Sequence, residues 1–203
     1  MPTISRLFDS YSSAGPAMRE LVAAGVPKDD ISIVANNADN FYDEKANLVD
    51  RDNDGVDDRT EGGAGAGAGL GAVIGGAAGL LTGLGVMAIP GVGPVVAAGW
   101  LASTALGALA GGTAGGIIGA LTKSGIPEED AHVYAEGLRR GGVLLTVRTN
   151  AENNATAERI LQKYGVDTGA RADAYRKTGW SRFDEGAPSL TAEQIRAERD
   201  TYR

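Results

Sequence analysis

An acidic stretch at residues 50–61 carries the side chains with the clearest potential for chemistry in this chain. It reads Asp-Arg-Asp-Asn-Asp-Gly-Val-Asp-Asp-Arg-Thr-Glu, which matches the calcium-loop pattern D-x-D-x-D-G-x5-E without a gap. Ca²⁺ takes about six to eight oxygen ligands, and an acidic loop with a sharp glycine turn supplies them. The pattern predicts these ligands: Asp50, Asp52, Asp54, the carbonyl of Val56, Asp58 and a bidentate Glu61.

Two features of this stretch depart from a paired calcium-binding helix–loop–helix. Asp57 takes the eighth position, where an apolar residue is usual, and no second loop of this kind is present in the sequence. The alternative is a solvated acidic linker that separates an apolar segment from the rest of the chain. If the loop binds Ca²⁺, the ion stiffens the base of the segment that follows Glu61.

The remaining composition argues against catalysis and against nucleic acid as a partner. The chain has no cysteine and one histidine, His132, so thiol chemistry is excluded and histidine triads are disfavoured. No phosphate loop or activated nucleophile is recognisable, so we predict a protein that is not an enzyme, with no catalytic and no cofactor-binding residues. The net charge is −7, and the sequence has no basic stripe that could neutralise phosphates, so nucleic acid is not expected as a partner.

Glycines at four-residue spacing dominate the centre of the chain, where no charged residue occurs between Glu61 and Lys123. Glycine costs a helix about 0.8–1 kcal/mol against alanine, but small residues at i, i+4 form a stripe that another helix can approach closely. The first ladder comprises Gly63, Gly67, Gly71, Gly75, Gly79 and Gly83, and the second Gly107, Gly111, Gly115 and Gly119, extended backwards by Gly99 and Ser103.

The two ladders predict a helical hairpin over residues 62–122, with its turn at the Pro-Gly-Val-Gly-Pro run that begins at Pro90. Each arm has roughly 25 residues, more than the ~20 that span hydrocarbon. Residues four apart shift steadily around a straight helix, so a long glycine ladder cannot face one partner along its whole length. It is therefore expected to contact several neighbouring helices, which favours a homo-oligomer. Three interpretations stay open: hairpins packed in a soluble assembly, a membrane hairpin that forms an oligomeric pore, and an Ala/Gly linker of low complexity.

The residues on either side of the hairpin predict an α+β fold. Strands are expected at residues 3–8 and 30–35 around a helix that starts at Gly15-Pro16 and ends at Gly25. After a helix that begins at Pro127, residues 143–148, 153–164 and 170–175 read as strand, helix and weak strand. We interpret these as two βαβ halves of one ferredoxin-like split βαβ domain. The hairpin then leaves and returns on the same side of the sheet.

The predicted organisation has five parts, and the last is a tail expected to fasten to the body, which is the domain formed by the N-terminal and C-terminal halves. Residues 178–183 are expected to dock aromatic rings on the sheet, and Thr191 to Gln194 form a capping box before a helix with Ile195 inside. The parts are the N-terminal half (1–49), the acidic loop (50–61), the hairpin (62–122), the C-terminal half (123–175) and the tail (176–203).

The N-terminus shows no secretory signal, which favours a cytoplasmic protein, with membrane association left open. His132 is expected to be a surface or half-buried helix residue without a catalytic role.

Several runs together resemble one bacterial family. They are the glycine ladder, Ala88-Ile-Pro-Gly-Val-Gly-Pro-Val95, Gly125-Ile-Pro-Glu-Glu129 and Arg140-Gly-Gly-Val-Leu144. The chain is similar over roughly residues 1–175 to the 17M-like general stress protein domain family, also described as low-temperature-induced or heat-induced stress proteins. The resemblance implies a non-enzymatic, stress-associated bacterial protein, and it carries no catalytic residues over to this chain.

Overall fold

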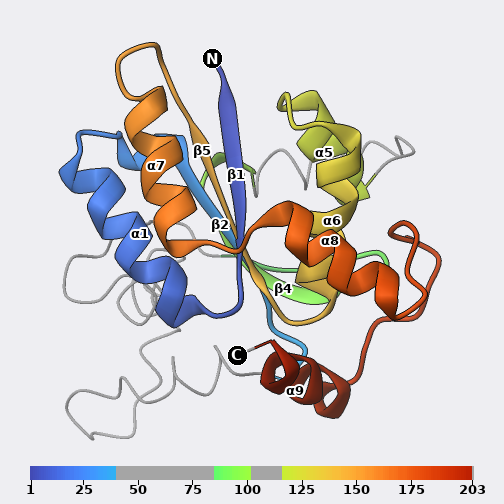
Figure 1. Cartoon of the computed structure of the whole chain (residues 1–203). Coiled ribbons are helices and arrows are strands. Elements are labelled where there is room, and N and C mark those ends of the chain that lie inside the picture. Colours follow the sequence, from blue (N-terminus) through green and yellow to red (C-terminus); the bar gives the residue numbers. More distant parts are fainter. Residues whose placement is uncertain (40–84, 102–115, 203) are drawn as a thin grey trace, which may run out of the picture.

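The computed structural model describes residues 1–39, 85–101 and 116–202, which form an antiparallel sheet with helices on both faces (Figure 1). The α+β prediction is confirmed. In spatial order the strands are β1 (Thr3–Phe8), β5 (Val143–Arg148), β2 (Ile31–Asn36), β4 (Gly93–Ala98) and β3 (Gly85–Ile89). The helices are α1 (Tyr11–Ala23), the 3₁₀ turn η1 (Lys28–Asp30), α5 (Gly116–Lys123), α6 (Glu128–Arg139), α7 (Asn154–Tyr164), α8 (Thr168–Lys177) and α9 (Ala192–Thr201).

Two split βαβ units interlock in this sheet. β1 and β2 both pair antiparallel with β5, so they run parallel to each other with β5 between them. β4 and β5 both pair antiparallel with β2, so the connection through α5 and α6 also joins two parallel strands around a third. β1 therefore lies at one edge of the sheet and β3 at the other. The narrower ferredoxin-like assignment stays a prediction.

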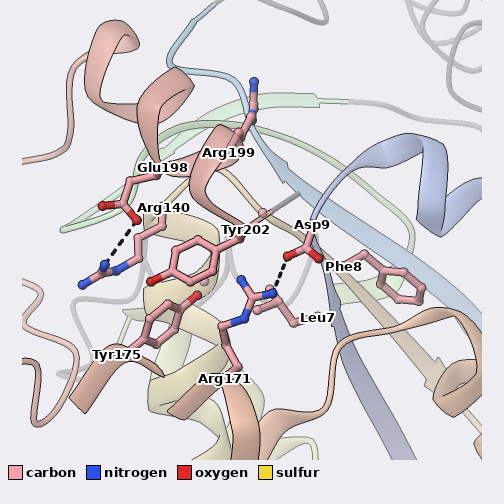
Figure 2. Close-up of a pocket in the computed structure, with 11 residues that line it drawn as sticks. Leu7, Phe8, Asp9, Arg140, Arg171, Tyr175, Glu198, Arg199 and Tyr202 are labelled. Carbon is pink, nitrogen blue, oxygen red and sulfur yellow. Dashed lines mark hydrogen bonds and ion pairs between the residues drawn. The ribbon is translucent and has the colours of Figure 1, made fainter. Parts of the chain in front are cut away.

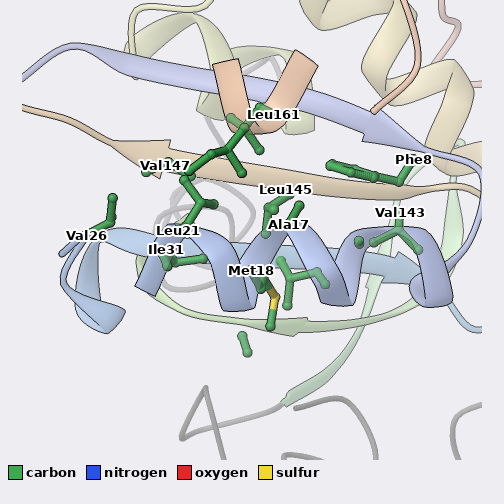
Figure 3. Close-up of a cluster of buried hydrophobic side chains, with 14 of the residues drawn as sticks. Phe8, Ala17, Met18, Leu21, Val26, Ile31, Val143, Leu145, Val147 and Leu161 are labelled. Carbon is green, nitrogen blue, oxygen red and sulfur yellow. The ribbon is translucent and has the colours of Figure 1, made fainter. Parts of the chain in front are cut away.

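The core has two layers, because successive strand residues point to opposite faces. Phe8, Val143 and Leu145 face α1 and α7, where they join Met18 and Leu161 (Figure 3). The other face packs against α5 and α6, and its cluster includes Leu7, Leu144, Leu121, Leu138 and Phe183.

The prediction of a final strand at residues 170–175 is wrong, because these residues belong to α8. The side chain of Asp167 accepts a hydrogen bond from the backbone N–H of Ala170 and starts this helix. Ala172 and Tyr175, three residues apart on one helical face, are the buried members.

The prediction of helices throughout residues 62–122 is wrong for residues 85–98, which form the β3–β4 hairpin. The Pro90-Gly91 pair makes the turn: Val92 N–H donates to the Ile89 carbonyl at 3.0 Å, and Gly91 has φ of +73°. Proline followed by a glycine of positive φ is the pattern of a type II turn. The expected turn is present, but it joins two strands. Gly99 has φ of +88° and does not extend a helical ladder.

The expectation that residues 62–122 leave and return on one side of the sheet is not tested, because residue 62 lies outside the described residues, but the strands show where the chain joins the sheet. Asp39 follows the C-terminal end of β2, whereas Gly85 enters opposite Ala97, which pairs with Val34 in the middle of β2. β3 and β2 are parallel, since both pair antiparallel with β4. We call residues 62–84 and 102–115 the first and second glycine-rich segments. They therefore belong to two separate connections of the fold, with the β3–β4 hairpin between them.

α1 begins at Tyr11, earlier than the predicted start at Gly15, because Ser10 and Ser13 form a capping box. None of the helices within the described ranges is long and apolar enough to cross a bilayer.

Candidate functional site

Most of the residues predicted to have a functional role lie outside the described residues. The calcium-loop residues Asp50 to Glu61 belong to this group. So do the glycines of the first ladder and Gly107, Gly111 and Gly115 of the second. Within the described ranges, no group of three or more metal-ligating side chains comes together.

Gly119 is the ladder residue that the structure does place, in the middle of α5. A Cβ atom at this position would meet nothing within 4 Å. The glycine therefore faces open space on the described part of the chain, and no close helix contact there requires it.

A cluster of charged and aromatic side chains lies where the tail meets the body (Figure 2). We call this cluster the tail seam. It surrounds a small pocket between the end of β1, α6, α8 and α9. Its polar and aromatic lining consists of Asp9, Arg140, Arg171, Tyr175, Glu198, Arg199 and Tyr202.

The helix α9 presents one face to this seam because of its residue spacing. The capping box of Thr191 and Gln194 starts the helix, as predicted. Ile195, Glu198, Arg199 and Tyr202 follow at i, i+3, i+4 and i+7, which places them on one side of a helix. Ile195 is fully buried, as predicted, and it packs over Gly141.

Arg199 ties α9 to the place where the chain leaves the sheet after β2. Its Nε donates to the carbonyl of Gly141 at 2.9 Å and its Nη2 to the carbonyl of Asn36 at 3.1 Å. Its Nη1 forms an ion pair with Asp39. Side-chain exposure is 15% for Arg199 and 6% for Asp39, so this pair is shielded from water.

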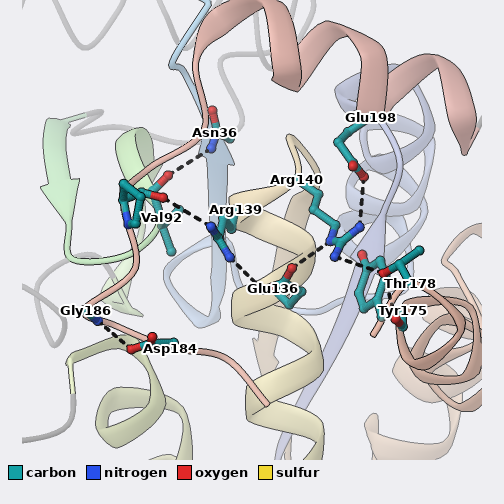
Figure 4. A network of polar contacts seen from close by, with 11 residues as sticks. Asn36, Val92, Glu136, Arg139, Arg140, Tyr175, Thr178, Asp184, Gly186 and Glu198 are labelled. Carbon is teal, nitrogen blue, oxygen red and sulfur yellow. Dashed lines mark hydrogen bonds and ion pairs between the residues drawn. The ribbon is translucent and has the colours of Figure 1, made fainter. Parts of the chain in front are cut away.

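A buried carboxylate on α6 organises the second set of contacts (Figure 4). The side chain of Glu136 is 2% exposed and accepts from Arg140 Nε at 2.7 Å. Arg140 also pairs with Glu198 of α9 at 3.2 Å. Burial opposes the charged form of Arg140, but the hydrogen bonds and charges of Glu136 and Glu198 together outweigh it and raise the Arg140 pKa. Arg139 lies 3.7 Å from the second oxygen of Glu136 and donates to the carbonyl of Pro188.

Aromatic rings and guanidinium groups fill the rest of the seam. Tyr175 makes edge contacts with Tyr202 and Trp180, at centroid distances of 5.8 and 5.7 Å. Arg140 stacks on Tyr175 at 4.6 Å and Arg171 on Tyr202 at 4.4 Å. Burial raises the pKa of Tyr175 far above its usual range, so its hydroxyl stays protonated at neutral pH.

The expected docking of the tail's rings on the sheet is correct for one ring. Phe183 joins the core cluster on the sheet. Trp180 instead packs with Val133, Ala172 and Tyr175 between helices. His132 is half-buried on α6, 3.2 Å from an Arg182 nitrogen and 3.6 Å from a Glu128 oxygen, as expected for a structural helix residue.

The seam is suited to holding elements together. Arg140, Arg171 and Arg199 each have a carboxylate partner, in Glu136 and Glu198, Asp9, and Asp39 respectively. The opposite charges are matched inside the cluster, so the seam fastens α9 to the body.

Sequence reasoning missed the seam, although one signal for it was present. The tail helix was predicted, and its i, i+3, i+4, i+7 pattern of Ile, Glu, Arg and Tyr identifies the side that docks. Its partners on β2, α6 and α8 had no recognisable pattern.

Comparison with known proteins finds no match to this chain among protein families, curated proteins or solved structures.

Proposed function

We propose that this protein is a non-enzymatic assembly protein of the bacterial stress response, in which a folded body holds two glycine-rich segments that mediate self-association. The main support for this proposal is that the described residues immediately before each of the two connections that carry the segments are held by specific side-chain contacts. The ferredoxin-like assignment is kept as a proposal: in its support, β1 and β2 enclose β5, whereas the expected second half at residues 143–175 ends in helix α8.

The start of the connection that carries the first segment is held by the tail. Arg199 binds Asp39 and the carbonyl of Asn36, immediately before residue 40. Asn36 itself donates to the carbonyl of Leu138 at 3.0 Å, which links the end of β2 to α6. The direction in which the chain leaves the sheet is thus set by three elements.

The start of the second segment is held by β2 and the turn before it. Trp100 Nε1 donates to the carbonyl of Asp30 at 3.2 Å, and Leu101 N–H donates to Ser32 Oγ at 3.3 Å. Arg148 stacks on the Trp100 ring at 4.9 Å and pairs with Asp30. A body that fixes both departure points supports a role in presenting the segments in a defined relation to each other.

The glycine ladders supply the second part of the argument. Stripes of small residues at i, i+4 allow helices to approach closely, in water or in lipid. Because the segments enter the fold as separate connections, each ladder is free to meet a different neighbour. This favours an assembly with several contacts between copies rather than one closed hairpin within a single copy.

Leucine substitutions at Gly71, Gly75 and Gly111 test the proposal. We expect the triple variant to sediment as a smaller species than the wild-type protein, because leucine fills the stripe on which neighbouring helices approach. Analytical ultracentrifugation measures the change, and far-UV circular dichroism shows that the body stays folded. An oligomer of unchanged size contradicts ladder-driven assembly.

Gly169→Leu is the matched control for these substitutions, because Gly169 lies in α8, outside both ladders, and is exposed. A Cβ atom there meets only Asp167 Oδ1 at 3.4 Å, so the leucine should leave the size of the oligomer unchanged. Carbonate extraction of membranes distinguishes a soluble assembly from one in the bilayer. A protein that stays in the membrane fraction supports the pore-forming membrane interpretation in place of the soluble assembly.

Calcium regulation of the assembly is a second proposal, which rests on the loop pattern at residues 50–61. Calorimetric titration with Ca²⁺ should give a saturable signal that Asp50→Ala with Glu61→Ala abolishes, because these residues supply the first and last ligands. A flat titration at millimolar calcium would remove the proposal and leave ladder-driven assembly untouched.

A further inference from the structure

We propose that the tail seam is a docking groove for a short helix, and that the tail of a second copy of this chain can occupy it in place of the chain's own tail. This inference does not depend on the glycine ladders. It assigns a second, polar mode of contact between copies to the C-terminal segment.

The ligand of the groove is defined by the contacts of α9. Ile195 fills an apolar slot over Gly141, Glu198 pairs with Arg140, and Arg199 pairs with Asp39. Tyr202 completes the face at i+7, in edge contact with Tyr175. A helix that places side chains at i, i+3, i+4 and i+7 in a groove is a recurring mode of peptide recognition.

The chemistry of this contact favours exchange over permanent packing. Ile195 is the one buried residue of α9, and the other contacts are ion pairs, hydrogen bonds and ring edges. α9 has 10 residues, and isolated helices shorter than about 12–15 residues are marginal in water. The tail helix is therefore stable mainly when docked, and Ile195 is the one side chain of α9 that undocking moves from full burial into water.

The tail of a second copy fits because every copy carries both the groove and the tail helix that is complementary to it. A chain's own tail competes at an effective concentration on the order of millimolar. Docking within one chain therefore dominates in dilute solution. Docking between chains becomes competitive when copies are held close together, and it then links neighbouring bodies through the exit point of residues 36–39.

A labelled peptide of residues 189–202, added to the full-length chain, measures the groove directly. The variant Ile195→Asp undocks the chain's own tail and leaves the groove intact. We expect saturable binding, by fluorescence anisotropy, at least tenfold tighter to the Ile195→Asp chain than to the wild type, where the resident tail competes. Equal binding to the two chains, or no binding to the variant, overturns the groove. Should Ile195→Asp disturb the body by circular dichroism, Arg199→Ala serves as the tail-undocking variant.

A charge exchange between Asp39 and Arg199 tests the specificity of the groove. A peptide carrying Arg199→Glu should bind the Ile195→Asp chain at least tenfold more weakly than the wild-type peptide. With Asp39→Arg added to the chain, this difference should shrink, because the glutamate then meets an opposite charge, although it still cannot donate to the carbonyls of Asn36 and Gly141. A preference that does not change with residue 39 contradicts the assigned pairing.

The same exchange identifies a second copy as the source of the tail. An Asp39→Arg chain and an Arg199→Glu chain are each mismatched within themselves, but the second chain's groove keeps Asp39 and therefore matches the first chain's tail, which keeps Arg199. Because the protein has no cysteine, a single Lys28→Cys substitution at an exposed position allows site-specific labelling. Energy transfer in the mixture should exceed that of wild type with wild type and of either variant with itself. No increase overturns docking between copies, and the sedimentation of the ladder variants remains a separate measurement.

Discussion

Replacing Arg140 by leucine is expected to lower the free energy of unfolding by about 3–5 kcal/mol, the cost of leaving a buried charge without its partner. Glu136 is 1% exposed, and its hydrogen bond to Arg140 is the closest contact of its carboxylate. Arg139, at 3.7 Å, is too far away to replace that bond. The midpoint of thermal unfolding should fall by about 6–20 °C, at about 2–4 °C per kcal/mol for a chain of this size.

The double variant Glu136→Leu with Arg140→Leu separates the buried charge from general loss of packing. Removing both partners also removes the desolvated carboxylate, so the double variant should be more stable than Arg140→Leu alone. Arg176→Ala is the surface control: Arg176 pairs with Glu129 at 3.3 Å with both side chains exposed, and its loss should cost less than about 1 kcal/mol. A double variant no more stable than the single one contradicts this account of Glu136.

The elements with a clear period or clear caps were predictable from the sequence. The strand at residues 143–148 is present with those bounds, and α7 begins one residue after the predicted start. Both are flanked by turn residues and carry apolar side chains at the spacing their structure requires. The capping box at Thr191 gave the start of α9 for the same reason.

The β3–β4 hairpin could not be separated from helix by the same reasoning. Five of the six residues of β4 are buried, so it reads as a continuous apolar run without alternation. Such a run is ambiguous between a buried strand and a buried helix. The four-residue spacing of glycines on both sides then favoured helix, although the valines at 92, 95 and 96 suit a strand.

The seam was beyond sequence reasoning because its contacts join distant positions. Arg140 and Glu198 are 58 residues apart, and Arg199 is 160 residues from Asp39. Nothing local requires an arginine at position 199, since its partners are two carbonyls and a carboxylate that only the folded sheet brings together. Charged residues on an exposed-looking tail helix are usually solvated, so the sequence favoured the less specific interpretation.

These contacts change the meaning of the tail for the whole protein. A tail that only covered the core would be fastened through apolar residues such as Phe183. α9 is fastened mainly through charges, and its strongest contacts lie at residues 36–39, where the chain leaves the sheet. The state of the tail and the position of residues 36–39 are therefore coupled through Arg199.

Gly99→Ala should destabilise the fold by about 2–5 kcal/mol, and it tests the corrected structure of the central stretch. Gly99 has φ of +88°, a region that costs other residues about 1–2 kcal/mol. A Cβ atom would also press on the backbone of β2, at the carbonyl of Ile31 and 2.8 Å from the Cα of Ser32, and overpacking of this kind adds about 1–3 kcal/mol. If Gly99 instead belonged to a helical ladder, alanine would be tolerated or stabilising.

Gly25→Ala supplies the matched control, because Gly25 has nearly the same φ of +87° but a Cβ there meets nothing within 4 Å. Its cost should be the backbone cost alone, about 1–2 kcal/mol. The difference between the two variants in chemical denaturation therefore measures how closely the chain beyond β4 approaches β2. Equal costs would mean that the second glycine-rich segment does not start from a fixed point on the sheet, and the support for a body that presents both segments would be lost.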